Sequence, residues 1–226
     1  MAKGVQRLKV LITGTSSGIG KATAERFLQS GHEVVGIDIL PPTINHSRYT
    51  HFVADVANAD SLPDVDGIEI LIPNAGTVEE DTAIDVNLRG YINTGEKYAF
   101  QETMKAIVLV GSIAARTGLD TLNYCASQGG RVSYAKNLAL RVGHWRQIPC
   151  NIVSFGATHT SLEQKLYDND EKYQAVADEA LLKKWCYPDE AAEWLYFVAT
   201  MNKSMTGQNI LIDNGEEANY NFIEWR

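Results

Sequence analysis

One stretch of the chain, residues 13–20 (Thr-Gly-Thr-Ser-Ser-Gly-Ile-Gly), constrains the fold more than any other. It follows an apolar run at residues 8–12, which is typical of a β-strand, and precedes residues 21–30, whose helical pattern is ended by Gly31. At such a junction the N–H groups of the first helical turn point into the glycine-rich turn, where the helix dipole favours an anion. Three glycines also let the backbone turn sharply and let a pyrophosphate approach it closely. The stretch therefore predicts the start of a nucleotide-binding unit.

The spacing of the glycines excludes two common phosphate-binding motifs. A P-loop has four residues between its glycines and then Lys-Ser/Thr, whereas five residues separate Gly14 from Gly20 here and Ala22 follows Lys21. The pattern Gly-x-Gly-x-x-Gly also fails, because Ser16 stands where the second glycine belongs. The pattern that fits is Thr-Gly-x-x-x-Gly-x-Gly, and its meaning depends on residues further along the chain.

Composition narrows the class of protein. The chain has 226 residues, of which 45% are hydrophobic and 21% charged, as expected of one globular α/β domain. A net charge of −8 with no basic cluster argues against a nucleic-acid partner. No apolar run is long enough to span a bilayer or to serve as a signal sequence, so we expect a cytoplasmic protein with no membrane partner. The three cysteines have no metal or redox spacing, which predicts free thiols and no metal site.

Apolar runs that alternate with helical stretches predict the fold. After the first strand, further strands are predicted at residues 33–37, 51–54, 69–72, 106–110, 150–154 and 209–212. Helices are predicted at residues 80–103 and 122–142 and from Pro188 onward, and the segment before residue 69 leaves room only for a short crossover. Strands that are apolar throughout indicate a parallel sheet covered on both faces. We therefore predict one domain over residues 1–226, an α/β doubly wound parallel sheet.

Asp38 ends the second predicted strand, about 20 residues past the glycines. A carboxylate at that place can accept hydrogen bonds from the ribose hydroxyls of an adenosine and would repel a 2′-phosphate. The positions where an NADP site would need Arg or Lys hold Ser17, Ile39 and Leu40. The alternative is an acid that merely ends a strand; together with the glycine-rich turn, the sequence favours NAD.

Several motifs in a fixed order resemble the short-chain dehydrogenase/reductase family over roughly residues 9–215. The matching motifs are Thr13 to Gly20, Asp55-Val56, Asn74-Ala75-Gly76, Asn87, Ser112, Tyr124 and Thr206-Gly207-Gln208. The resemblance implies a Rossmann-type sheet of about seven strands, with NAD(P) across the carboxyl ends of the strands. It also implies a homodimer or homotetramer in which the helices carrying Asn87 and Tyr124 meet between subunits.

The resemblance assigns a role to each matching position. The residues implied to bind the cofactor are Gly14, Ser16, Ser17, Gly18, Ile19, Asp38, Asp55, Val56, Asn74, Ala75, Gly76, Tyr124, Gln128, Thr158 and Thr160. Ser112 would hydrogen-bond the substrate oxygen, Tyr124 would transfer the proton, and Asn87 would hold a water in the proton relay. Residues 160–187 would form a lid over the substrate.

One departure from the family pattern concerns the catalytic tyrosine. A phenol has a pKa of about 10 and needs help to act as a base at neutral pH. In the family that help comes from a lysine four residues beyond the tyrosine, but here this position is Gln128. Gln128 can bind ribose hydroxyls without supplying charge, so we expect a severely reduced rate that a lysine at position 128 would restore. The chain is then a disabled variant, a slow or alkaline-shifted dehydrogenase, or a protein that binds its cofactor without catalysis.

The sequence thus predicts an NAD-dependent oxidoreductase that interconverts a secondary alcohol and a ketone, with Asn87, Ser112, Tyr124 and Gln128 as its catalytic residues. The alternative is a non-catalytic sensor or scaffold of the same descent that binds NAD(H). The identity of the alcohol or ketone does not follow from the sequence.

Overall fold

The computed structural model describes residues 7–163 and 168–219. Seven strands form one parallel sheet in the order β3-β2-β1-β4-β5-β6-β7, which confirms the predicted α/β doubly wound fold. The strands are β1 (Lys9–Thr13), β2 (Glu33–Asp38), β3 (Tyr49–Val53), β4 (Ile70–Ile72), β5 (Ala106–Ser112), β6 (Cys150–Phe155) and β7 (Asn209–Ile212). The order of the chain reverses between β1 and β4, and this is where ligands bind in open α/β sheets.

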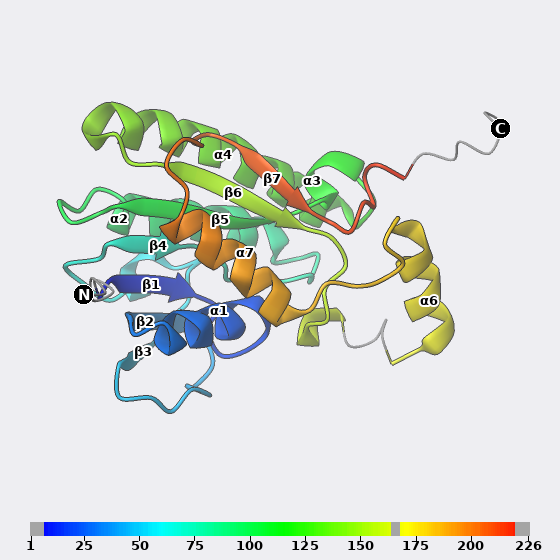
Figure 1. Cartoon of the computed structure of the whole chain (residues 1–226), viewed down its shortest axis with the longest axis horizontal. Helices are drawn as coiled ribbons and strands as arrows, with labels where there is room; N and C mark the ends of the chain where they lie inside the picture. Colours follow the sequence, from blue (N-terminus) through cyan, green and yellow to red (C-terminus); the bar gives the residue numbers. More distant parts are fainter. Residues whose placement is uncertain (1–6, 164–167, 220–226) are drawn as a thin grey trace, which may run out of the picture.

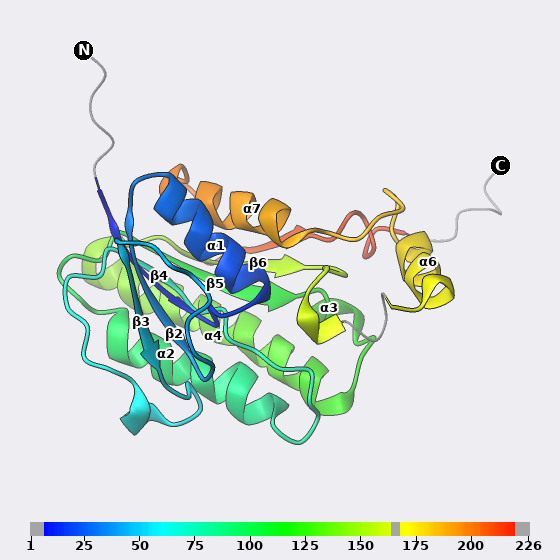
Figure 2. The ribbon, with the colours of Figure 1, turned by 90° about the horizontal axis from the view of Figure 1, so that it is seen from below.

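Helices cover both faces of the sheet. α1 (Gly18–Gln29) and α7 (Pro188–Thr200) lie on one face, and α2 (Gly90–Tyr98) and α4 (Leu122–Arg146) lie on the other (Figures 1 and 2). Because successive side chains of a strand point to opposite faces, Val10 and Ile12 belong to one apolar core and Leu11 belongs to the other. The central strands β1, β4 and β5 are mostly apolar because both of their faces are buried, whereas the edge strands β3 and β7 are partly exposed.

The crossover from β3 to β4 is as short as the sequence predicts. It contains only a 3₁₀ turn, η1 (Ala59–Ser61), whose start is capped by Asn58 accepting from the Asp60 N–H at 3.2 Å. β3 begins two residues earlier than predicted, because Tyr49 pairs with Val34 of β2. This edge of the sheet therefore lacks the long helix that usually joins parallel strands.

The helix predicted at residues 80–103 is shorter and begins differently. A π-helical segment, η2 (Ile84–Arg89), leads into α2, which ends at Tyr98. The carbonyl of Asn87, inside the wider π turn, accepts a hydrogen bond from Arg131 of α4 at 2.5 Å. π-helical turns are rare and often occur at functional sites. A tertiary contact of this kind has no signal in local sequence, which explains the difference.

The predicted lid follows β6. It contains the short η3 (Ser161–Glu163) and α6 (Asp170–Glu179), whereas residues 164–167 lie outside the described part. α6 stands apart from the sheet at the carboxyl ends of the strands (Figure 1). Its Tyr173 ring stacks on Trp185 at 5.3 Å, and the Trp185 indole N–H donates to the Tyr173 carbonyl at 3.1 Å. These contacts attach α6 to the segment that leads into α7.

Other sequence expectations concern membranes and thiols. No helix in the described ranges is long and apolar enough to cross a membrane. Cys150 and Cys186 are buried free thiols, and burial raises the pKa of Cys150 to about 12. Cys125 is also a free thiol and is partly exposed.

Candidate functional site

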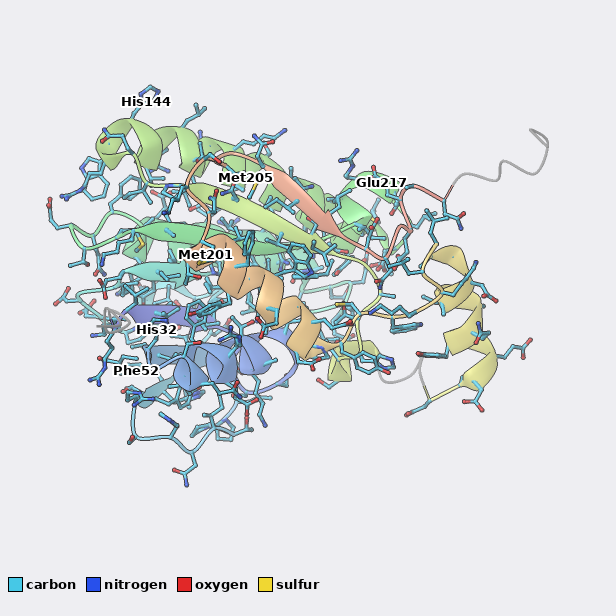
Figure 3. The ribbon with its side chains drawn as sticks, in the orientation of Figure 1. His32, Phe52, His144, Met201, Met205 and Glu217 are labelled. Carbon is cyan, nitrogen blue, oxygen red and sulfur yellow. The ribbon has the colours of Figure 1, made fainter. Side chains whose placement is uncertain are left out.

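A cleft of about 780 Å³ runs along the carboxyl ends of the strands. It brings together all but one of the residues that the sequence assigned to the site. These are Gly14, Ser17, Gly18, Ile19, Asp38, Asp55, Val56, Asn74, Ala75, Gly76, Asn87, Ser112, Tyr124, Gln128, Thr158 and Thr160. A smaller hollow of about 310 Å³ near Ile148 and Met205 lies toward the other end of the molecule, as does His144, and contains none of them (Figure 3).

The glycine-rich turn adopts a backbone that other residues would disturb. Gly14 and Gly18 have φ angles of +75° and +54°, in the left-handed region that favours glycine. A Cβ atom on Gly20 would lie 2.0 Å from the Gly14 carbonyl oxygen, so no side chain fits there. Thr160 of the lid covers the turn, since its methyl group would lie 3.4 Å from a Cβ on Gly18. The turn is therefore a close-packed cradle at the start of α1.

The floor of the cleft is fixed by hydrogen bonds between β1 and the loop after β4. The Thr13 hydroxyl accepts from the backbone N–H groups of Asn74 and Ala75 at 2.9 and 3.0 Å. In return, the Asn74 amide donates to the Thr13 carbonyl at 2.9 Å. These bonds hold the Asn74-Ala75-Gly76 loop against the glycine-rich turn.

Asp38 lies at one end of the cleft, where its carboxylate is held by backbone hydrogen bonds, one of them from Ser16. The Asp38 carboxylate accepts from the backbone N–H groups of Ser16 and Leu40, both at 2.9 Å. The Ser16 hydroxyl donates to the Pro41 carbonyl at 2.9 Å and is not among the atoms that line the cleft. Ser16 is thus placed to hold the loop after β2, unlike the other residues assigned to the site.

Ser112 and Tyr124 come from the end of β5 and the first turn of α4. Both line the cleft. The start of α4 has no side-chain cap of its own, and Glu80 takes this place by accepting from the Asn123 N–H at 2.9 Å. Hydrogen bonds from Thr121, Asn123 and Tyr124 lower the pKa of Glu80, so its charge stays at the positive end of the helix dipole. Glu80 thereby fixes the turn that carries Tyr124.

Asn87 is completely buried and hydrogen-bonded at every polar side-chain atom. Its amide oxygen accepts from the Thr77 N–H at 2.9 Å, and its amide group donates to the Thr77 carbonyl and to the Ser127 hydroxyl at 2.9 and 3.2 Å. The Ser127 hydroxyl in turn donates to the Tyr124 carbonyl at 2.7 Å. Asn87 therefore ties the loop after β4 to the helix that carries Tyr124, and the relay water stays a prediction.

Arg131 is a further residue of the cleft that the family pattern does not predict, because that pattern has a lysine as the cation near Tyr124. Arg131 lines the cleft, is 4% exposed, and donates from Nη1 to the Gln128 side-chain oxygen at 3.2 Å. The signal was present in the sequence: Arg131 follows Gln128 by three residues and Tyr124 by seven, so all three share one face of a helix. Arg131 is the basic residue of the cleft lining described here.

Three acidic side chains also line the cleft: Glu179 at the end of α6, Glu216 after β7 and Asp120 in the loop before α4. Glu216 accepts from the Ala157 N–H at 2.9 Å, and burial raises the pKa of Glu216 to about 6. Its neighbour Glu217, labelled in Figure 3, pairs at 2.5 Å with Arg116 of α3 (Ala114–Thr117). This ion pair holds the segment after β7 at this end of the cleft. Among the described residues no cluster of three or more His, Cys, Asp or Glu could hold a metal ion.

Comparisons with known proteins agree with this geometry. Residues 14–217 match the family model described as enoyl-(acyl carrier protein) reductase. The chain is 30% identical to the 3-oxoacyl-[acyl-carrier-protein] reductase FabG of Thermotoga maritima, over 91% of this chain and 96% of that protein. It is 26% identical to the glucose 1-dehydrogenase of Gluconobacter oxydans, over 92% and 91%.

A solved structure supports the same relationship. The crystal structure of a short chain dehydrogenase family protein from Francisella tularensis is 27% identical, with a TM-score of 0.85 over 94% of this chain and 100% of that chain. Together with the cleft at the switch point of the sheet, these similarities show that the chain belongs to the short-chain dehydrogenase/reductase family of oxidoreductases.

Proposed function

We propose that the protein is an NAD-dependent oxidoreductase that interconverts a secondary alcohol and a ketone by hydride transfer. The observation that carries the proposal is that Ser112 and Tyr124 line the same cleft as the glycine-rich turn and Asp38. One continuous space thus contains groups suited to a dinucleotide and two hydroxyl groups suited to an alcohol oxygen. Hydride transfer between a cofactor and an alcohol requires that combination.

The residues of the cleft fit a dinucleotide. The turn has no room for a side chain at Gly20, so backbone N–H groups at the start of α1 can approach a pyrophosphate closely. Ser17, at the start of α1, makes no side-chain cap, and the first turn of α1 contains no acidic residue. The helix start therefore presents uncapped N–H groups and no negative charge to the cleft, as an anionic ligand requires.

The charges along the cleft favour NAD over NADP. Asp38 stands at the end of β2 with its carboxylate held by two backbone N–H groups, and the other acid on this side is Asp55. Arg131, the basic residue of the described lining, is bonded to Gln128, not to the loop that carries Asp38. A 2′-phosphate would meet a carboxylate there with no cation to offset it.

Calorimetric titration with NAD and with NADP tests the choice of cofactor. We expect NAD to bind at least tenfold more tightly, and Asp38→Ala to reduce that ratio. Asp60→Ala, which removes an exposed acid from the 3₁₀ turn η1, is the matched control and should leave the ratio unchanged. Equal affinities of the unmodified protein for the two cofactors would contradict the assignment.

Each residue in the reaction has a distinct task. A bound nicotinamide would accept the hydride in alcohol oxidation and return it in ketone reduction. Ser112 would donate a hydrogen bond to the substrate oxygen, on which negative charge develops. Tyr124 would take the hydroxyl proton during oxidation and give it back during reduction. The alcohol thus loses one hydride and one proton to become the ketone.

NADH formation with a panel of secondary alcohols tests the activity. Tyr124→Phe is expected to lower the rate by about 10²–10⁴-fold, the usual contribution of a general base, while NAD affinity changes little. Tyr196→Phe, on α7 and outside the cleft lining, should keep the rate. NAD binding without turnover of any alcohol or ketone would instead favour the non-catalytic alternative.

A further inference from the structure

The position that holds a lysine in related dehydrogenases holds an uncharged Gln128, yet a positive charge lies next to it. α4 places Tyr124, Gln128 and Arg131 on one face. Long side chains on a helix lean toward its N-terminus, so Arg131 reaches back over the preceding turn. Its Nη1 atom lies 3.2 Å from the Gln128 oxygen, and both residues line the cleft.

The surroundings of Arg131 leave its charge uncompensated. Its backbone hydrogen-bond partners are neutral carbonyl oxygens, those of Ala75, Asn87 and Val110, at 2.5 to 3.3 Å. The guanidinium also lies over the face of the Tyr91 ring, 3.8 Å from its centre. Within the described ranges no carboxylate forms an ion pair with Arg131.

Burial does not remove this charge. Burial lowers the pKa of the Arg131 guanidinium, while the phenols of Tyr91 and Tyr124 act in the opposite direction. An arginine side chain nevertheless stays protonated in proteins, because its ordinary pKa lies above about 12. The positive charge is therefore permanent, and the Tyr124 phenol interacts with it.

Hydrogen bonding fixes the orientation of Gln128. A guanidinium can only donate, so the Gln128 amide oxygen faces Arg131. The NH₂ group of Gln128 is then the donor that this pair offers to a ligand. The lysine of the family combines a charge and a donor in one atom, whereas here the two lie on neighbouring side chains.

We propose that Arg131 supplies the positive charge that stabilises the Tyr124 phenolate, while Gln128 supplies the hydrogen-bond donor for the cofactor ribose. Arg131 acts through the field at Tyr124 and is a positioning residue; it does not exchange a proton with the substrate. The catalytic importance of this field rests on the proposed dehydrogenase function. The assignment of the charge itself can be tested without cofactor or substrate.

Titration of the Tyr124 phenol in the unmodified, cofactor-free protein is the primary test. With ¹³C-labelled tyrosine, Tyr124→Phe identifies the Tyr124 resonance, and its chemical shift is followed with pH. We expect a pKa below the ordinary value of about 10, although position 128 has no charge. A pKa at or above that value would overturn the proposal, and this measurement needs no variant of Arg131.

Substitutions of Arg131 then test the source of the effect. Arg131→Met should raise the pKa of Tyr124 by about one unit or more, because it removes a nearby cation. Arg131→Lys should keep most of the effect. Arg141→Met is the matched control on the same helix, since Arg141 pairs with Glu96 on the surface, and it should leave the titration unchanged. No change with Arg131→Met in a folded protein would overturn the proposal.

A lysine at position 128 gives an independent test on turnover. The family pattern alone predicts that Gln128→Lys restores the rate. In the structure, however, a lysine at this position would face the buried guanidinium of Arg131, so no gain in rate is expected. The double variant Gln128→Lys/Arg131→Leu moves the cation to position 128 instead of adding a second one. We expect its turnover rate to be about tenfold higher than that of Gln128→Lys alone. A rate gain of tenfold or more from Gln128→Lys alone would contradict the proposal.

The two proposals fail in different ways. If no alcohol is oxidised but the pKa of Tyr124 is low and rises in Arg131→Met, the charge assignment holds and the proposed dehydrogenase function fails. If alcohols are oxidised but the pKa of Tyr124 is the same in the unmodified protein and in Arg131→Met, the dehydrogenase function holds and the charge assignment fails.

Discussion

Individual side chains give different parts of the cleft lining opposite charges. Arg131 brings a buried positive charge beside Gln128, whereas Asp120, Glu179 and Glu216 bring acidic groups to other parts of the lining. Burial favours the protonated form of Glu216 and raises its pKa to about 6. Neutral, hydroxylated substrates suit such a surface better than anionic ones, which these carboxylates would repel.

The pKa of Glu216 predicts a specific dependence of stability on pH. Its folded-state pKa of about 6 lies above the ordinary value of 4.5, so the folded protein holds this proton more tightly than the unfolded chain does. The free energy of unfolding should therefore fall as the pH rises from 4.5 through 6, by at most about 2 kcal/mol from this group. Glu216→Gln, which resembles the protonated form, should remove that part of the slope.

Urea unfolding at several pH values measures the effect as a difference between proteins, so that other titrating groups cancel. Glu217→Gln is the adjacent control, because it removes a neighbouring carboxylate, one that pairs with Arg116, and leaves Glu216 in place. Identical slopes for the unmodified protein and Glu216→Gln would refute the prediction.

At the level of elements, the junction of β1 with α1 determines the geometry of the cleft. Gly20 lies in the first turn of α1 against the Gly14 carbonyl, and Asn74 bridges β1 to the loop after β4. The turn therefore has no room to relax without moving either the helix or that loop. The shape of the turn is therefore set by close packing between β1, α1 and the loop after β4.

Gly20→Ala should be strongly destabilising. The added Cβ would lie 2.0 Å from the Gly14 carbonyl oxygen and 2.4 Å from the Asn74 amide, and such overpacking costs about 1–3 kcal/mol or more. Gly143→Ala within α4 meets no atom within 4 Å and should instead raise the free energy of unfolding by about 0.5–1 kcal/mol. Urea denaturation of both variants checks the contrast; equal effects would show that the turn tolerates a side chain.

The sequence predicted those secondary-structure elements that are determined by residues close together in the chain. The strands and α1 follow from apolar runs and glycines, and Asp38 follows from its place at the end of β2. The π turn at η2 and the role of Ser16 could not be predicted, because both depend on partners far away in the sequence. Arg131 could have been predicted, since helical spacing alone puts it beside Gln128; it was missed because only lysines were considered as the cation.

At the scale of the whole molecule, one end of the cleft is bordered by two segments that are far apart in the sequence. α6 and the residues after β7 meet there: the Asn219 amide donates to the Glu179 carbonyl at 2.6 Å, and the Leu182 N–H donates to the Asn214 carbonyl at 3.0 Å. The N-terminal end of the described chain lies at the opposite side (Figure 2). The substrate end of the cleft therefore depends on the C-terminal part of the fold.

The assembly state stays a prediction from family resemblance. Sedimentation equilibrium should give two or four times the chain mass of 24.9 kDa. The resemblance assigns the contact to the helical segments that carry Asn87 and Tyr124, which are η2 with α2 and α4; Leu140 of α4 is 63% exposed. Phe197 of α7 and Met201, which follows α7 and is labelled in Figure 3, are also exposed. Leu140→Glu should lower the mass if α4 forms the contact, and Phe197→Glu should do so if α7 does. A mass of 24.9 kDa for the unmodified protein would exclude both.

Trp185 gives the protein an optical probe at the cleft. Its indole is 1% exposed and lines the cleft next to the lid, whereas Trp145 and Trp194 are 38% and 44% exposed on α4 and α7. Titration of NADH into a protein with Trp145→Phe, Trp194→Phe and Trp225→Phe, in which Trp185 is the one remaining tryptophan, should therefore quench most of the indole emission by energy transfer to the reduced nicotinamide. Fluorescence could then count occupied clefts directly, before any substrate has been identified.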